Sequence, residues 1–310
     1  MNRTAFKIAK NMVRFILLLF FLFLLFFFYD KEHMSEAFKQ ILSHPVMIVV
    51  IVGIYCLSFF LKGVAWKLYL NEGVRISSCM IGLFYSLLFN HLLPLKVGDG
   101  LRVMVMNQRE KQISVEQSFH SVFVLRVLDT LALMVLVILG LPFFPFPLEL
   151  PGIVPVALVG IAIMTAGVIL VAAFPDFLMR QYHMLKDALS GARGLLVIGL
   201  VSISWMMEGA ILFGVAAIIG APLPLETSIW INSVTIIGQL FQFAPGGLGT
   251  YESVMSFTLL SVGVPLSEGL SMAIISHGLK FIFSFIVGGI VIVRSPVSFE
   301  NMKRWVKLKG

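Results

Sequence analysis

Eight apolar runs constrain the fold of this 310-residue chain, because most of them are long enough to cross a lipid bilayer. The run at 12–29 has Arg14 as its only charge, and about 18 helical residues span roughly 30 Å of hydrocarbon. Hydrophobic residues make up 59% of the chain and charged residues 13%, which leaves no sizeable soluble domain. We therefore predict an all-α, polytopic integral membrane protein. The runs lie at about 12–29, 46–70, 76–94, 115–140, 151–173, 193–219, 226–244 and 267–293.

The first run has a second interpretation, as a cleavable signal peptide. It is longer than the typical apolar core of such a peptide, and no small-x-small cleavage site follows it before Tyr29. We therefore expect 12–29 to be a membrane span.

The distribution of Lys and Arg predicts that only six of the eight runs cross the membrane. If the runs at 76–94 and 226–244 enter the bilayer and turn back, the inside segments hold 19 of the 23 basic residues. The outside segments then hold only Lys31 and Lys39, in agreement with the positive-inside rule. We expect about six spanning helices plus two re-entrant helical hairpins in the plasma membrane, with both termini cytoplasmic.

This arrangement divides the chain into two halves of opposite orientation. Residues 1–150 form the first predicted repeat, with its re-entrant segment near 76–112. Residues 151–310 form the second, inverted repeat, with its re-entrant segment near 226–262. Inverted-topology repeats commonly place a substrate between the halves near the bilayer midplane, and they support alternating access.

The two re-entrant segments carry matching breaks, at Pro94–Asp99 and at Pro245–Thr250. Proline cannot donate to a helix ladder, and glycine accepts backbone angles that other residues avoid. Asp99 and Thr250 are good N-cap residues for the helices that follow. Because a helix N-terminus attracts anions, such an end suits a phosphate. The predicted substrate-binding residues here are Lys96, Gly98, Asp99, Arg102, Pro245, Gly246, Gly247, Gly249 and Glu252.

Two interpretations of Lys96 and Arg102 remain open. They could hold a phosphodiester beside the first break, Arg102 by a bidentate fork and Lys96 as a point charge. They could equally be interfacial residues whose long side chains snorkel toward water. The second break has Glu252 in place of a basic residue, so the two breaks differ in chemistry.

Ionisable residues inside spans are functional candidates because a charge in hydrocarbon is costly. Arg126 and Asp129 are three residues apart on one helix face, and an offset of 151 residues maps them onto His277 and Lys280. These four could bind a substrate around a pseudo-two-fold axis, or form ion pairs that hold the halves together.

Glu208 lies near the middle of its span, and the offset gives it no charged counterpart. It could couple transport to protons or face a wet cavity. Lys62 and Lys67, near the end of another span, are expected to snorkel.

Several other function classes lack their signatures. No nucleotide-binding glycine loop, metal-spaced His/Glu pair or G-x-S-x-G elbow occurs, so we expect no cofactor and no ATP-driven step. Cys56 and Cys79 lie in apolar runs and suggest neither a disulfide framework nor a metal site. The formal charge of +7 comes from short loops, so it indicates topology and anionic lipid contacts, not nucleic acid.

The chain resembles the lysylphosphatidylglycerol synthase transmembrane-region family, also called the flippase-like domain family, over nearly its whole length. The resemblance rests on Leu93–Arg102, on Arg126-x-x-Asp129 and on Ala244–Glu252. It implies an integral membrane domain with re-entrant helices that translocates lipids. The soluble aminoacyltransferase domain of full-length synthases is not present, so synthesis of a lysyl-lipid is not expected. His277 stands where arginine is frequent in the family, which leaves the role of that position open.

Three function hypotheses follow. The first is a lipid flippase or transporter that moves an anionic or lipid-linked headgroup between leaflets by alternating access. The second is a membrane-embedded transferase acting on a lipid-linked substrate, with Asp99 or Glu208 as general base. The third is an accessory subunit that binds a lipid or a separate lipid-modifying enzyme. The expected partners are membrane lipids, and the sequence leaves the lipid and the oligomeric state open.

Overall fold

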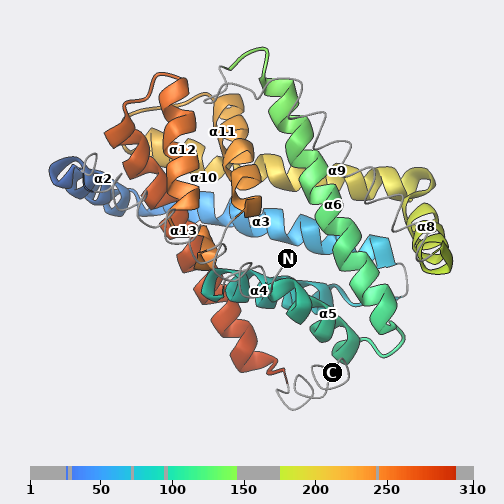
Figure 1. Ribbon diagram of the computed structural model, residues 1–310. Coiled ribbons are helices and arrows are strands. Elements are labelled where there is room, and N and C mark those ends of the chain that lie inside the picture. The colour runs from blue at the N-terminus through green and yellow to red at the C-terminus, as the bar shows by residue number, and fades with distance from the viewer. Residues whose placement is uncertain are drawn as a thin grey trace, which may run out of the picture.

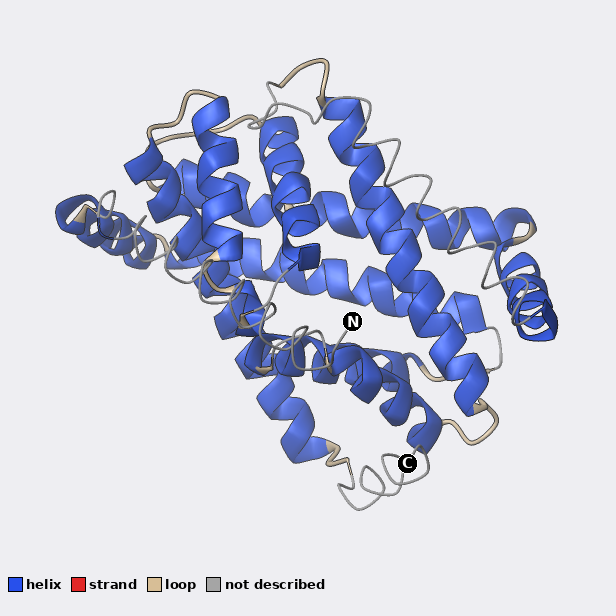
Figure 2. Cartoon of the chain, viewed as in Figure 1, coloured by secondary structure: helices blue, strands red, loops and turns tan. Residues whose placement is uncertain are grey.

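Helices form every regular element that the computed structural model describes (Figure 2). The structure describes residues 26, 30–70, 73–93, 97–144, 175–241 and 244–297, with the backbone alone at 176–178. The predicted span at 151–173 and all of the one at 12–29 except Phe26 lie outside these residues. The prediction of an all-helical chain is therefore confirmed for the described part.

Four long apolar helices have the length to cross a membrane. They contain 26 to 29 residues each, or roughly 40 Å at 1.5 Å per residue. Their ends agree with the predicted runs to within two residues. They are α3 (Pro45–Leu70), α6 (Val115–Gly140), α13 (Leu266–Arg294), and α9 (Gly191–Glu208) continued by α10 (Ala210–Ile218).

Two helical hairpins lie between the long helices, where the re-entrant segments were predicted (Figure 1). In hairpin 1, α4 (Ile76–Leu92) is followed by the first break, and α5 (Gly98–Arg109) packs back against it. In hairpin 2, α11 (Leu225–Gly238) ends in two short 3-10 turns, and α12 (Thr250–Ser261) packs back against it. The turns are η1 (Gln239–Phe241) and η2 (Pro245–Gly247).

Hairpin 1 is closed by polar contacts across its break. The Gly98 amide donates to Asn90 Oδ1 at 2.8 Å, and Asn90 Nδ2 donates to Ser86 Oγ at 3.3 Å. Ser86 Oγ donates in turn to Asp99 Oδ1 at 2.9 Å. A Cβ on Gly98 would overlap the Ser86 carbonyl oxygen and lie 2.8 Å from the Ser86 Cα. Glycine is therefore required for α5 to approach α4 this closely.

Hairpin 2 turns through glycines with positive φ. Gly246, Gly247 and Gly249 have φ of 63°, 76° and 81°, a region that residues with a side chain rarely adopt. A Cβ on Gly246 would also overlap the ring of Phe281 on α13. The break thus places bare backbone directly against a long helix.

The predicted N-cap roles of Asp99 and Thr250 are wrong. Val97 and Gly249 occupy the N-cap positions, and neither supplies a side-chain cap. Asp99 lies in the first turn of α5 and turns toward Ser86 and Arg126, because the ionic contact competes with capping. At the start of α12, the Glu252 side chain reaches back and accepts a hydrogen bond from the Gly249 amide at 2.7 Å.

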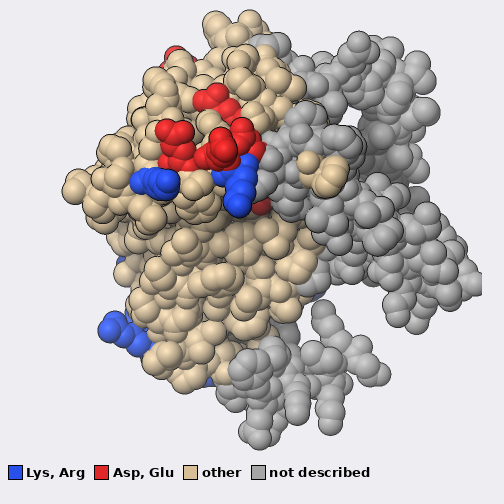
Figure 3. Space-filling view, turned by 90° about the vertical axis from the view of Figure 1, so that its left-hand side faces the viewer, with Lys and Arg blue, Asp and Glu red and all other residues tan. Residues whose placement is uncertain are grey.

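The outer surface suits a lipid environment. Apolar side chains such as Val49, Ile138, Ile198 and Ile286 are exposed on the long helices. Figure 3 shows charged side chains gathered at one place, where the amphipathic helix α2 (Lys31–Ser43) lies. Met34, Ala37 and Ile41 form the buried face of α2.

A second surface helix, α8 (Pro175–Leu189), precedes α9.

At the base of hairpin 1, Glu110 accepts hydrogen bonds from Ser78 Oγ and from Arg75 Nε, the latter at 3.0 Å. Burial alone raises the pKa of Glu110, but these hydrogen bonds outweigh it and hold the pKa below its usual value. The ionised carboxylate therefore anchors the α5–α6 connection to the start of α4.

Candidate functional site

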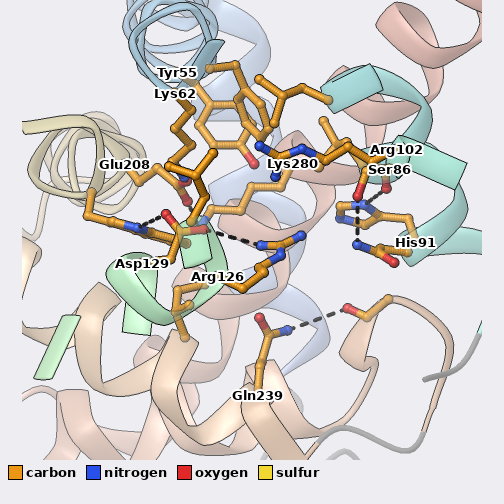
Figure 4. Close-up of a pocket in the computed structure, with 18 of the residues that line it drawn as sticks. Tyr55, Lys62, Ser86, His91, Arg102, Arg126, Asp129, Glu208, Gln239 and Lys280 are labelled. Carbon is orange, nitrogen blue, oxygen red and sulfur yellow. Dashed lines mark hydrogen bonds and ion pairs between the residues drawn. The ribbon is translucent and has the colours of Figure 1, made fainter. Parts of the chain in front are cut away.

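A cavity of about 160 Å³ lies where the two hairpins meet the long helices (Figure 4). A protein cavity of about 150 Å³ can bind a molecule as large as benzene, so this cavity has room for a small polar headgroup. Of the predicted site residues, seven line it: Arg102, Arg126, Asp129, Glu208, Gly246, His277 and Lys280.

The other predicted residues lie around this cavity or outside the described chain. Asp99 and Glu252 contact lining residues directly, as shown below. Gly98, Pro245, Gly247 and Gly249 belong to the breaks and are not part of the lining. Lys96 and Pro94 lie outside the described residues.

Glu208 is the centre of a buried ion cluster. Lys62 on α3 contacts its Oε1, and Lys280 on α13 lies 3.6 Å from its Oε2. Lys280 also donates to Asn232 Oδ1 at 2.9 Å, and the Lys62 ammonium lies 3.4 Å from the centre of the Trp205 ring. The expectation that Lys62 snorkels is therefore wrong, because packing of α3 against α9 gives its ammonium a partner inside the protein. Glu208 likewise has partners that the sequence offset could not supply.

Arg126 is held between two carboxylates. Its guanidinium donates to Asp99 on α5, at 2.6 Å to Oδ1 and 3.0 Å to Oδ2, and lies 3.6 Å from Asp129 Oδ2. Asp129 also accepts the Trp205 indole N–H at 2.8 Å. The predicted Arg126–Asp129 pair is thus present, and Asp99 adds the stronger contact.

His277 joins α13 to both sides of the second break. Its Nδ1 lies 2.7 Å from Glu252 Oε1, and its Nε2 lies 3.1 Å from the Gly246 carbonyl oxygen. The Tyr251 ring stacks on the imidazole, with centres 4.1 Å apart. Both ring nitrogens of His277 therefore face acceptor oxygens, one on Glu252 and one on the backbone of the break.

These contacts tie each break to the long helix that follows it. Asp99 near the start of α5 binds Arg126 of α6, and Glu252 near the start of α12 binds His277 of α13. Arg126 and His277 are the residues that the 151-residue offset matches. Each hairpin is therefore connected to the long helix that follows it by a carboxylate and a basic residue, arginine in one case and histidine in the other.

The tips of the two hairpins meet at the cavity. His91 lies near the end of α4. The centre of its ring is 4.5 Å from the centre of the Phe281 ring and 6.4 Å from the centre of the His277 ring. Gln239 Nε2 donates to the Gly246 carbonyl at 3.4 Å and lines the same space. The polar residues that precede the breaks thus face the cavity or bridge the break.

Several amide groups at the breaks already have partners. Gly98 donates to Asn90, and Gly249 donates to Glu252, as described above. Gly247 and Leu248 donate to the carbonyls of Ala244 and Pro245 at 3.1 and 3.2 Å. A phosphate at either break would compete with these contacts, which directs attention to the side-chain cations.

Aromatic lining residues were not predicted from the sequence. Tyr55, Phe59, Trp205 and Tyr251 line the cavity and surround the ion cluster. Tyr251 precedes Glu252 directly, which was the one local signal available for it. No cluster of three or more His, Cys, Asp or Glu side chains placed to hold a metal ion occurs among the described residues.

Comparison with known proteins identifies a family. A sequence model described as the lysylphosphatidylglycerol synthase TM region matches residues 11–288, which is most of the chain. No curated protein and no solved structure matches the chain. The family match includes both breaks and every residue that lines the cavity.

Proposed function

We propose that this chain moves a membrane lipid between leaflets. The chain belongs to the lysylphosphatidylglycerol synthase transmembrane-region family, which is the first support for this function. The headgroup, anionic or lipid-linked, enters the cavity between the hairpins while the acyl chains stay in the bilayer. The observation that carries this proposal is a charged cavity of headgroup size at the meeting point of two helical breaks.

The energetics of the bundle support a functional cavity. Lys62, Arg102, Arg126, Asp129, Glu208 and Lys280 come from five separate helices and converge on one space inside an apolar protein. Burying this many charges is costly, and a purely structural core of apolar residues would avoid the cost. A polar substrate that must pass through the bilayer gives a reason to retain them.

An inverted repeat would supply the motion. In this proposal residues 1–150 and 151–310 are the two halves, six spans flank two re-entrant hairpins, and both termini are cytoplasmic in the plasma membrane. The matched Asp99–Arg126 and Glu252–His277 contacts support such a relation. Opening one contact while the other stays closed would expose the cavity to one side at a time.

The transferase alternative has less support from the geometry. Its candidate general bases, Asp99 and Glu208, are each engaged by cations. A carboxylate held this way is a weak proton acceptor. The accessory-subunit alternative predicts lipid binding without movement, so a transport assay separates it from the proposed function.

The direct test is reconstitution of the purified chain in liposomes with fluorescent lipids of several classes. Accessibility of the label to a membrane-impermeant quencher reports movement between leaflets. We expect movement faster than in protein-free vesicles. If no lipid class moves faster, lipid translocation is the wrong function.

Arg126→Ala is expected to abolish this transport while the protein still inserts into the membrane. The change leaves Asp99 and Asp129 without their shared cation and removes the ionic contact between hairpin 1 and α6. Arg294→Ala is the matched control, because Arg294 is exposed at the end of α13. Normal transport by the Arg126 variant would contradict a role for this contact in the cycle.

A further inference from the structure

We propose that Arg102 is the anchor for the phosphate ester of the lipid headgroup, and that the cavity selects headgroups with a net negative charge. This inference rests on the proposed function and names the substrate class of the same cavity. It also assigns different roles to the two arginines: Arg102 binds the ligand, while Arg126 holds hairpin 1.

Arg102 lies in a preformed position. Its guanidinium stacks on the Trp66 ring at 4.0 Å, and the Trp66 indole N–H donates to Ser121 Oγ at 2.9 Å, which fixes the ring. Gly82 leaves the room for this stack, since a Cβ there would lie 2.9 Å from the Trp66 ring and 3.6 Å from Arg102 Cγ. Three helices, α3, α4 and α6, thus hold the α5 arginine in one orientation.

Arg102 is also unpaired within the described residues. It has no carboxylate within 4.0 Å there, and its buried Nε has no hydrogen-bond partner. Only 3% of the residue is exposed, and Arg102 lines the cavity together with Ser86 and His91 (Figure 4). Burying an arginine without a partner is costly. A ligand anion that reaches Arg102 can form the charged hydrogen bonds that no protein group forms with it among the described residues.

The other cavity cations differ from Arg102 in this respect. Lys62 and Lys280 share Glu208, and Arg126 is bound by Asp99 and Asp129. His277 lies 2.7 Å from Glu252 Oε1.

The pairing of the lining cations leads to the substrate class. Lys62, Arg126 and Lys280 each lie within 4.0 Å of a carboxylate, whereas Arg102 has none within that distance among the described residues. A phosphodiester carries one negative charge and presents two oxygens to the planar guanidinium fork. A headgroup with an additional ammonium finds no free carboxylate among the described lining residues. Singly anionic phospholipids should therefore bind better than zwitterionic ones.

The test measures binding and transport separately. The purified protein in detergent is titrated with phosphatidylglycerol or phosphatidylethanolamine, and retained lipid is quantified by native mass spectrometry. We expect a preference for phosphatidylglycerol, and we expect Arg102→Gln to weaken its binding roughly 10- to 100-fold. Arg102→Lys keeps the charge but loses the fork, so an intermediate loss is expected. Arg294→Gln is the matched control and should bind like the wild type.

Competition by inorganic phosphate distinguishes a lipid phosphate from a free one. Millimolar phosphate should leave phosphatidylglycerol binding unchanged if the lipid is the ligand. Displacement of the lipid by phosphate alone would overturn the lipid assignment. Equal binding of both lipids, or an Arg102→Gln variant that melts normally and still prefers phosphatidylglycerol, would overturn the inference.

These outcomes are separable from failure of the proposed function. If wild-type vesicles move no lipid but Arg102-dependent binding is seen, lipid translocation fails and the anchor remains. If wild-type vesicles move phosphatidylethanolamine as fast as phosphatidylglycerol, and Arg102→Gln has no effect, translocation remains and the anchor fails.

Discussion

Replacing Glu208 by Gln is expected to lower the free energy of unfolding by about 3–5 kcal/mol. Glu208 is 3% exposed and is the carboxylate that neutralises Lys62 and Lys280 together. Without it, two ammonium groups remain buried with no anion between them, and their repulsion adds to the cost of desolvation. Thermal unfolding of the purified protein in mild detergent measures the change.

Companion variants show whether charge, and not shape, causes the loss. Lys62→Gln should cost less, because Glu208 keeps Lys280 as its partner. The double variant Lys62→Gln/Glu208→Gln should be more stable than Glu208→Gln alone, since one of the two unpaired charges is gone. Glu226→Gln, at an exposed position at the start of α11, is the matched control and should melt like the wild type. Additive losses in the double variant would show that the ion cluster is not the origin of the effect.

The long helices and the positions of the breaks could be predicted from the sequence because their causes are local. A helix in hydrocarbon must satisfy its own backbone, so an apolar run of sufficient length has few alternatives. This is why α6 begins and ends where the run at 115–140 does. The breaks follow from the missing proline N–H and from glycine conformation, and the positive φ of Gly246 confirms that interpretation for the second break.

The partners of the buried charges could not be predicted, because tertiary packing decides them. Lys62 and Glu208 are 146 residues apart, and only the packing of α3 against α9 brings them together. Arg102 lies within a recognisable motif, but its stack on Trp66 depends on the space left at Gly82. A single sequence contains no signal for such a contact.

The 151-residue offset pairs the basic residues of the two contacts with each other, but it does not pair their acidic residues. It pairs Arg126 with His277, and each of these residues contacts a carboxylate near a break, but it places Asp99 opposite Thr250 and not opposite Glu252. Asp99 is the second residue of α5, whereas Glu252 is the third residue of α12. One residue rotates a helix side chain by about 100°, so each acid faces its base from a differently oriented helix. Matching positions therefore do not have to carry matching chemistry.

Gly98→Ala is expected to have the second large effect, a loss of more than about 3 kcal/mol in the free energy of unfolding. The new Cβ would overlap the Ser86 carbonyl oxygen and lie 2.7 Å from Asn90 Oδ1. Backbone atoms cannot move aside as a flexible side chain can, so α5 must separate from α4. The separation would also break the hydrogen bond from the Gly98 amide to Asn90 and displace Asp99 from Arg126.

Gly100→Ala provides the matched control on the same helix. Gly100 is exposed, and a Cβ there would meet nothing within 4 Å. Alanine favours the helix over glycine by about 1 kcal/mol, so this variant should be as stable as the wild type or more stable. The two substitutions are chemically identical and two residues apart, so a difference between them isolates the close approach of α5 to α4.

Cys79 provides a reporter of hairpin opening that is independent of melting temperature. It is fully buried on α4, whereas Cys56 on α3 is exposed. In a Cys56→Ser background, a maleimide should react slowly with Cys79 in the wild type and in Gly100→Ala, and quickly in Gly98→Ala. Equal reaction rates in the two glycine variants, together with equal melting temperatures, would mean that α5 does not need glycine to close hairpin 1. The contact between Asp99 and Arg126 would then form without the close approach of α5 to α4, and the cavity would not depend on that approach.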